Sequence, residues 1–179
     1  MTNQRNIFFW ITLVAAAVVG SQLVIALANA LEAIDAIRWE RASGGQIPRG
    51  APQLGKDTDG APLYACVAQL EGKSYPGKLA SKFKGCNIAV NGREVSRNDY
   101  EVPVTGPDGR QHWLQQTDKN FSLRKTVSVR DGGGFSYFCS VGYRGGWQLG
   151  RKVAHENKCR FGYGGREIES AKYQILMSR

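Results

Sequence analysis

The 179-residue sequence predicts an all-β fold built from two copies of one module. After residue 40, glycine turns such as Asn91-Gly92 separate short runs of strand composition, and no long amphipathic helix appears. The second half of the chain also repeats the first at an offset of 73 residues. Cys66 corresponds to Cys139, and Cys86 corresponds to Cys159.

Other residues at this offset are mainly glycines and aromatics, the types least expected to agree by accident. A repeat of this length is not a solenoid unit, and it predicts two β-rich modules intertwined about one pseudo-twofold axis. We therefore expect up to two related binding sites. The further matches are Tyr64 with Tyr137, Gly72 with Gly145, Gly77 with Gly150, Gly92-Arg93-Glu94 with Gly165-Arg166-Glu167, Tyr100 with Tyr173, and, with a one-residue slip, Trp39 with Trp113.

The first 30 residues have the features of a targeting segment. Arg5 is the one charge before an apolar run over residues 7–30, and Ala28-Asn29-Ala30 has the small-x-small form of a signal-peptidase site. The run exceeds the roughly 7–15 residues of a signal core and approaches the roughly 20 residues of a membrane span. We expect a cleaved signal peptide or an uncleaved anchor helix that tethers the protein to a membrane. Either places the rest in a secreted, periplasmic or extracellular location.

The remaining chain divides at its two tryptophan-led copies. Residues 31–38 form a stem, 39–105 the first copy, 106–112 a connection with a Pro-Asp-Gly turn, and 113–179 a degenerate second copy. Because Pro103 cannot donate to a ladder, we expect its strand at a sheet edge. The predicted strands are Leu63–Leu70, Asn87–Val90, Tyr100–Val104, Thr126–Val129, Phe135–Tyr143, Arg160–Tyr163 and Tyr173–Met177.

An even number of cysteines in an exported domain predicts disulfides. Two pairings respect the repeat: Cys66–Cys86 with Cys139–Cys159, or Cys66–Cys139 with Cys86–Cys159. We favour the first, because it makes each copy self-contained, with about 3 kcal/mol from each closed loop. The chain has no C-x-x-C and only two histidines, so no metal site is expected.

Charge and motifs restrict the classes of function. The net charge of +9, or +8 once the targeting segment and its single arginine are removed, favours anionic partners. The basic residues are scattered and not interleaved with aromatics, so nucleic acid is not an expected partner. No hydrolase elbow, phosphate loop, metalloprotease motif or dinucleotide fingerprint occurs. We therefore expect neither an enzyme nor a bound cofactor.

The densest motif is Asp57-Thr58-Asp59-Gly60, followed by Tyr75-Pro76-Gly77-Lys78. A calcium loop would need further acidic ligands that the sequence lacks. An Asx turn and a polar binding edge remain as alternatives. In the second, Asp57 accepts two sugar hydroxyls while Lys78, presented by a turn, donates to sugar oxygens. Replacing Asp57 by Asn and Lys78 by Ala is then expected to abolish binding without changing the melting temperature.

With these motifs in order, the chain resembles the DM-nine repeat family over Trp39–Val104, and more loosely over Trp113–Met177. The resemblance implies two intertwined β-rich repeats and, for some members, calcium-independent mannose binding. It assigns the sugar to the aspartate that opens D-x-D-G and the lysine of P-G-K, here Asp57 and Lys78, with Asp59 supporting the turn. The matching segments are Gly45–Ala51, Asp57–Tyr64, Pro76-Gly77-Lys78, Cys86, Asn91–Glu94 and Tyr100-Glu101-Val102.

The second copy departs from this pattern. Its glycine turn retains Asp131 alone, and the counterpart of Lys78 is Arg151 by the offset or Lys152 by the spacing from Asp131. The second site is therefore expected to be altered or lost. Cys66 and its repeat partner replace residues that are not usually cysteine in the family, which suggests an added staple.

Other repeated residues have a structural interpretation. We expect Glu94 and Glu167 to bond neighbouring backbone, and the repeat-opening tryptophans to lie in the core together with Tyr100 and Tyr173. Trp147 is either a surface platform or a packing variant.

The sequence thus predicts an exported, calcium-independent, mannose-type lectin-like protein whose partners are glycans. The alternative is a non-catalytic interaction module for a protein or an anionic cell-surface polymer, whose binding would weaken with salt. The sequence leaves a homodimer open.

Overall fold

The structure is a computed structural model that describes residues 37–104, 111–115 and 126–178. The predicted signal or anchor segment and most of the stem and connection lie outside these residues. Among the described residues, no helix has the length and apolar character needed to cross a membrane.

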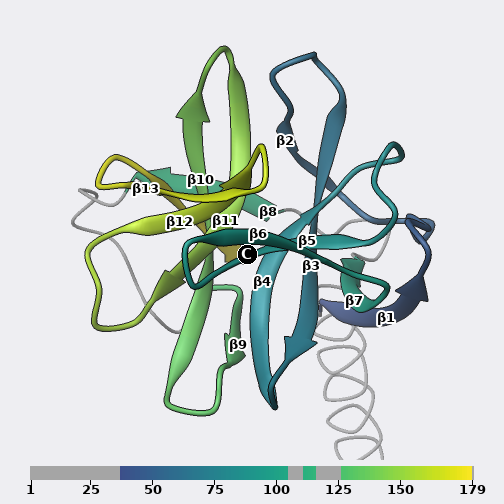
Figure 1. The fold of residues 1–179 in the computed structure, drawn as a ribbon, viewed down its shortest axis with the longest axis horizontal. Coiled ribbons are helices and arrows are strands. Elements are labelled where there is room, and N and C mark those ends of the chain that lie inside the picture. The colour runs from purple at the N-terminus through teal and green to yellow at the C-terminus, as the bar shows by residue number, and fades with distance from the viewer. Residues whose placement is uncertain (1–36, 105–110, 116–125, 179) are drawn as a thin grey trace, which may run out of the picture.

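The described part of the chain is all-β, as predicted. Its strands form one antiparallel sheet with the order β1-β7-β3-β4-β5-β6-β13-β12-β11-β10-β14-β8, to which β2 and β9 add at the side (Figure 1). The strands are β1 (Arg38–Ser43), β2 (Gln53–Lys56), β3 (Pro62–Leu70), β4 (Lys73–Leu79), β5 (Cys86–Val90), β6 (Arg93–Arg97), β7 (Asp99–Val104), β8 (Gln111–Gln115), β9 (Ser128–Arg130), β10 (Phe135–Tyr143), β11 (Gly146–Val153), β12 (Cys159–Tyr163), β13 (Arg166–Ser170) and β14 (Gln174–Ser178).

The strand bounds follow the offset of the sequence repeat. Adding 73 to the limits of β3, β5 and β6 gives the limits of β10, β12 and β13. Equivalent strands also follow one another in the same order from the two ends of the sheet: β1-β7-β3-β4-β5-β6 from one end and β8-β14-β10-β11-β12-β13 from the other. In the outer strands, Trp39 lies opposite Pro103 and Trp113 lies opposite Leu176, which reproduces the one-residue slip between the tryptophans.

The two halves meet at β6 and β13, where Arg93 pairs with Arg166. The Glu94 carboxylate accepts the Gly165 N–H at 3.0 Å, and the Glu167 carboxylate accepts the Gly92 N–H at 2.7 Å. Both glutamates thus bond to backbone, as predicted, but the backbone belongs to the glycine turn of the other half.

Each half has its own core around a disulfide. Cys66–Cys86 lies in one buried cluster with Tyr100, and Cys139–Cys159 lies in another with Tyr173. The favoured pairing of the cysteines is confirmed. A third cluster joins the halves, because Ala65 and Val67 of β3 pack with Val127, Phe138 and Leu176.

Two structural predictions are wrong. Trp39 is not in the core: its side chain is 36 % exposed and stacks on Phe138 at a centroid distance of 6.2 Å. The strand that contains Pro103 is not an edge, because β7 lies between β1 and β3. Proline is accommodated because β3 pairs with β7 only at Tyr100 and Glu101.

Candidate functional site

The Asp57-Thr58-Asp59-Gly60 segment is a tight turn directly after β2. The Asp57 N–H donates to Ala61 O at 2.8 Å, and the Gly60 N–H donates to Asp57 O at 3.0 Å. The Asp59 carboxylate accepts the Ala61 N–H at 3.0 Å, which is the Asx-turn geometry. Gly60 has a φ of +89°, a conformation that favours glycine. The turn fixes the Asp57 carboxylate beside the second half of the chain.

Three donors hold the Asp57 carboxylate. The Oδ1 atom accepts the Thr58 N–H at 2.8 Å and the Gln148 Nε2 amide at 2.9 Å. The Oδ2 atom lies 2.6 Å from Lys82 Nζ. Burial acts to raise the pKa of Asp57, but the bonds from Lys82, Gln148 and Thr58 outweigh it and lower the pKa to about 2. Asp57 is therefore ionised at neutral pH.

Lys78 lies in β4 and is 2 % exposed. Its ammonium donates to Gln148 Oε1 at 2.7 Å and to Gly162 O at 2.6 Å, and it lies 3.4 Å from Glu94 Oε1. Burial lowers the pKa of Lys78, while the charges of Glu94 and Asp57 partly oppose this shift. The Pro76-Gly77-Lys78 segment is thus strand and not the surface turn that the sequence predicted, and it directs its lysine into the protein.

Gln148 connects the two predicted sugar ligands. Its amide nitrogen donates to Asp57 and its amide oxygen accepts from Lys78, and the side chain is itself buried. We call Asp57, Lys78, Lys82, Glu94 and Gln148 the polar cluster. Because Gln148 belongs to the second half and the other four to the first, the cluster lies where the halves meet.

Lys82 is the cation of the polar cluster that reaches solvent. Its side chain is 40 % exposed, and its Nζ lies 2.6 Å from Asp57 Oδ2 and 2.5 Å from Asp59 Oδ2. It also lies 5.7 Å from the centroid of the half-buried Phe83 ring. A carboxylate pair, an ammonium and an aromatic ring therefore share one edge of the cluster.

The second half contains an altered version of the same arrangement. Arg151 donates to Ala89 O at 3.2 Å, the contact that corresponds by the offset of 73 to that of Lys78 with Gly162 O. Arg151 is therefore the structural counterpart of Lys78. Lys152, near the end of β11, instead donates to the backbone carbonyls of the next two residues, Val153 and Ala154.

The amide bridge has no equivalent in this second arrangement. By the offset, Gln148 corresponds to Tyr75, whose ring lies 5.2 Å from the Arg151 guanidinium carbon. The Asp131 carboxylate accepts from the Ser136 hydroxyl at 2.6 Å and from the Gly133 N–H at 3.3 Å. Burial raises the pKa of Asp131, but these bonds and the charge of Arg151 lower it overall.

The sequence analysis missed Lys82 and Gln148. By the offset, Gln148 corresponds to Tyr75, directly before the P-G-K motif. This difference between the two copies is the one sequence feature that could have pointed to Gln148. Lys82 follows Lys78 by four residues in a loop, and its spacing gave no indication of its contact with Asp57. Within the described residues, no three His, Cys, Asp or Glu side chains gather in a way that could hold a metal ion.

Comparison with known proteins places the sequence motifs in a family. Residues 30–97 match the family model of the DM9 repeat. The chain contains a DM9 repeat. The resemblance noted from the motifs is thereby confirmed, and the matched residues contain Asp57, Lys78 and Lys82 of the polar cluster. No sequence among the curated proteins matches the chain.

A solved structure shares the fold of this chain. The crystal structure of the nematode sperm cell motility protein MFP2B superposes with a TM-score of 0.60 at 16 % sequence identity. The match covers 81 % of this chain and 45 % of that chain, so this chain spans less than half of MFP2B. At this identity the likeness establishes the fold alone.

The bonds to Asp57 predict an acid-sensitive part of the stability. A carboxyl group whose pKa falls on folding stabilises the protein above its ordinary pKa of 3.8, and this contribution is lost as the pH falls towards 2. We expect the difference in melting temperature between the wild type and Asp57→Asn to shrink between about pH 4 and pH 2. Thermal unfolding of both proteins across that range is the measurement. A constant difference down to pH 2 would contradict the assignment.

Proposed function

We propose that this DM9 protein is an exported, calcium-independent carbohydrate-binding protein that takes mannose-type sugars at the solvent-facing edge of the polar cluster. The observation that carries the proposal is that the carboxylates of the buried Asp57 and the exposed Asp59 both meet the Lys82 ammonium, which reaches solvent beside the Phe83 ring. Two disulfides in a chain of this size agree with an exported protein.

The chemistry of this edge suits a sugar with vicinal hydroxyls. The two carboxylates accept O–H donors, and the Lys82 ammonium donates to sugar oxygens, so each bond is charge-assisted. The Lys82–Asp59 ion pair is exposed and contributes little by itself, so exchanging it for sugar contacts costs little. The Phe83 ring offers an apolar surface to the carbon-bound face of the sugar.

In this proposal Lys78 supports the site from beneath. It fixes Gln148, which in turn holds Asp57 Oδ1 and leaves Oδ2 directed towards Lys82. The family resemblance assigns the sugar contact to Lys78, but its ammonium is buried and bonded to protein oxygens. We therefore assign the contact to Lys82 and the positioning of Asp57 to Lys78.

The two halves are proposed to be two interlocked copies of one repeat, with one competent site. The second site lacks the amide bridge and has Arg151 in place of the buried lysine. One mannose-type sugar per chain is the expected stoichiometry.

The site is tested by removing the groups at its exposed edge. We expect Lys82→Ala and Asp59→Asn each to weaken binding of a mannose oligosaccharide at least tenfold, because each removes a charge-assisted bond, about 1.5–3 kcal/mol. Isothermal titration calorimetry measures the affinity. The matched control is Lys158→Ala, since Lys158 is an exposed lysine paired with Glu169 at 2.7 Å in the second half.

The melting temperatures of Asp59→Asn and Lys158→Ala should stay near that of the wild type, because these side chains are solvent-exposed. Lys82→Ala should lower it moderately, because it also removes a bond from the buried Asp57 carboxylate. Undiminished binding by Lys82→Ala, with the control also unaffected, would remove Lys82 and this edge from the proposal.

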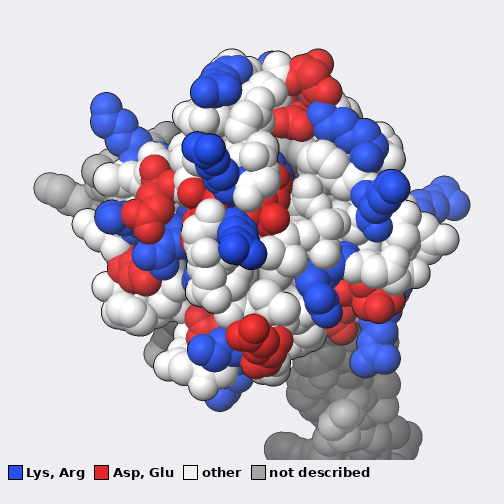
Figure 2. Space-filling view, in the orientation of Figure 1, with Lys and Arg blue, Asp and Glu red and all other residues white. Residues whose placement is uncertain are grey.

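An interaction with an anionic polymer is the weaker candidate. Figure 2 shows lysine and arginine side chains dispersed over the face in view, with acidic side chains between them, and not gathered in one basic patch. Anionic polymers bind most strongly to continuous basic surfaces.

A further inference from the structure

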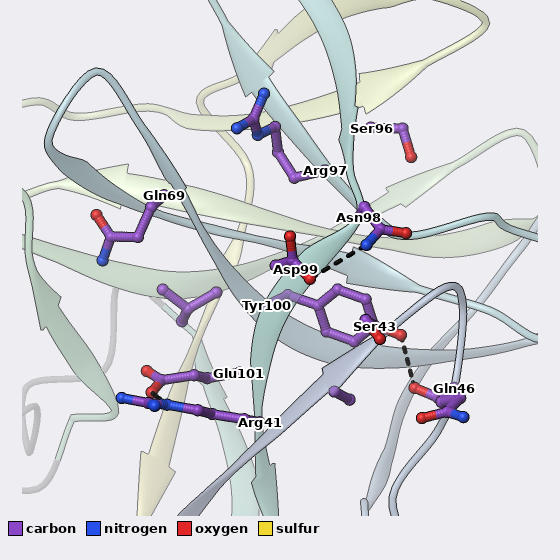
Figure 3. A pocket seen from close by; sticks show the side chains of 12 residues that line it. Arg41, Ser43, Gln46, Gln69, Ser96, Arg97, Asn98, Asp99, Tyr100 and Glu101 are labelled. Atoms are coloured by element: carbon purple, nitrogen blue, oxygen red, sulfur yellow. Dashed lines mark hydrogen bonds and ion pairs between the residues drawn. The ribbon is translucent and has the colours of Figure 1, made fainter.

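A groove with a volume of about 830 Å³ lies over β1, β7 and the adjoining part of β3. Figure 3 shows its lining, which is mostly polar and comes from the first half of the chain. None of the residues of the polar cluster lines it. The loop between β4 and β5 carries Lys82 of the polar cluster, and its Gly85 packs against the backbone of Arg97 and Asn98 on the groove wall.

Two carboxylates lie on the floor of the groove, two residues apart on the same strand. Asp99 and Glu101 alternate on β7 with the buried Tyr100, so both face the groove. Residues two apart on a strand are separated by about 6.5–7 Å. Opposite them on β1, Ser43 pairs with Asp99 and Arg41 pairs with Glu101.

Two guanidinium groups mark the ends of this acidic pair. Figure 3 shows Arg97 towards one end of the groove and Arg41 towards the other, with Asp99 and Glu101 between them. Arg41 lies beside Glu101 on the neighbouring strand, and Arg97 precedes Asp99 along the chain, so the groove combines two carboxylates with two guanidinium groups.

The charges of the groove are free to exchange partners. Arg41 and Glu101 are 3.7 Å apart, with side chains 91 % and 45 % exposed, and such a surface pair contributes little. The Asp99 carboxylate accepts one bond, from the Asn98 amide at 3.1 Å. Among the residues that the structure describes, the Arg97 guanidinium has no hydrogen-bond or ion-pair partner.

The corresponding surface of the second half does not have this set of charges. By the offset of 73, Lys172 and Gln174 replace Asp99 and Glu101, and Ser170 replaces Arg97. By strand register, Gln115 lies opposite Gln174 where Arg41 lies opposite Glu101. This set of charges is therefore particular to the first half and does not follow from the shared fold.

We propose that this groove binds an extended peptide segment with basic residues at positions i and i+2 and with acidic residues flanking them. In an extended chain, residues two apart point to the same side at the spacing of Asp99 and Glu101. The two basic side chains meet these carboxylates, and the flanking acidic side chains meet Arg97 and Arg41. The ring of Tyr100 is 4 % exposed, so the groove offers a sugar no aromatic surface to stack on.

Fluorescence anisotropy with the full chain tests the proposal. The probe is a labelled, end-blocked peptide Glu-Thr-Lys-Thr-Lys-Thr-Glu, and its control is the same composition with adjacent lysines, Glu-Thr-Lys-Lys-Thr-Thr-Glu. We expect the spaced peptide to bind at least tenfold more tightly. The double variant Asp99→Asn/Glu101→Gln should lose at least tenfold in affinity for it, whereas Glu169→Gln, at a surface ion pair in the second half, should not.

The melting temperature of the double variant checks that it is folded, which we expect because both side chains lie at the surface. Equal affinity for the two peptides, absence of binding, or unchanged affinity in the double variant would overturn the proposal. Displacement of the bound peptide by a neutral mannose oligosaccharide would also overturn it, and would assign the groove to glycans.

Discussion

Replacing Lys78 by alanine should destabilise the protein by about 3–5 kcal/mol, the usual effect of removing one partner from a buried ion pair. The substitution leaves the Glu94 carboxylate, 3.4 Å from the ammonium, without its cation. It also leaves Gln148 Oε1 and Gly162 O without the donor that satisfies them. Urea denaturation at neutral pH measures the loss. Because Lys78 is buried, we expect Lys78→Ala to lower the melting temperature, whereas the sequence alone predicted no change.

Two further variants show how much of the lost stability comes from the charge of Lys78 and how much from its buried position. Lys78→Met retains most of the volume in the core and should cost less than Lys78→Ala. Lys158→Ala, at a surface ion pair, should change the unfolding free energy by no more than about 0.5 kcal/mol. If Lys78→Ala were as stable as Lys158→Ala, the polar cluster would not hold the two halves together.

Removing either disulfide should lower the unfolding free energy by about 2–5 kcal/mol. Both bridges close loops with a sequence separation of 20, and both lie within the buried core of their own half. The double variants Cys66→Ser/Cys86→Ser and Cys139→Ser/Cys159→Ser should therefore lose similar amounts. Thermal and chemical unfolding of the two variants is the measurement.

A melting temperature unchanged by loss of one disulfide would show that the bridge does not stabilise its half. A much larger loss in one variant than in the other would contradict the equivalence of the two halves.

The sequence was sufficient to predict the plan of the fold. Cysteines and glycines at a fixed offset located both copies, since a glycine turn and a disulfide must recur wherever the same strands recur. This equivalence left two possible pairings of the cysteines, and the one favoured because it makes each copy self-contained, with Cys66 bonded to Cys86, is confirmed. The position of Pro103 was not predictable in the same way, because a strand can lie inside a sheet and still leave one residue outside the ladder.

The sequence predicted several of the residues that form the site, but it did not predict which of them are buried or what they contact. Asp57 and Lys78 lie in one cluster, but Lys78 is covered by residues 70 and 84 positions away, Gln148 and Gly162. Contacts of such long range depend on how the halves interlock, and local patterns do not encode them. For the same reason the spacing did not separate Arg151 from Lys152, and the structure selected Arg151 by its bond to Ala89 O.

Sugar binding at the edge formed by Asp57, Asp59 and Lys82 is the central claim, and calorimetric titration of the protein with a mannose oligosaccharide tests it most directly. The titration is made with a chelator present and at two salt concentrations. The account predicts saturable binding of one sugar per chain that is unaffected by the chelator and nearly unchanged by salt. Absence of binding, or binding that requires calcium, would contradict it.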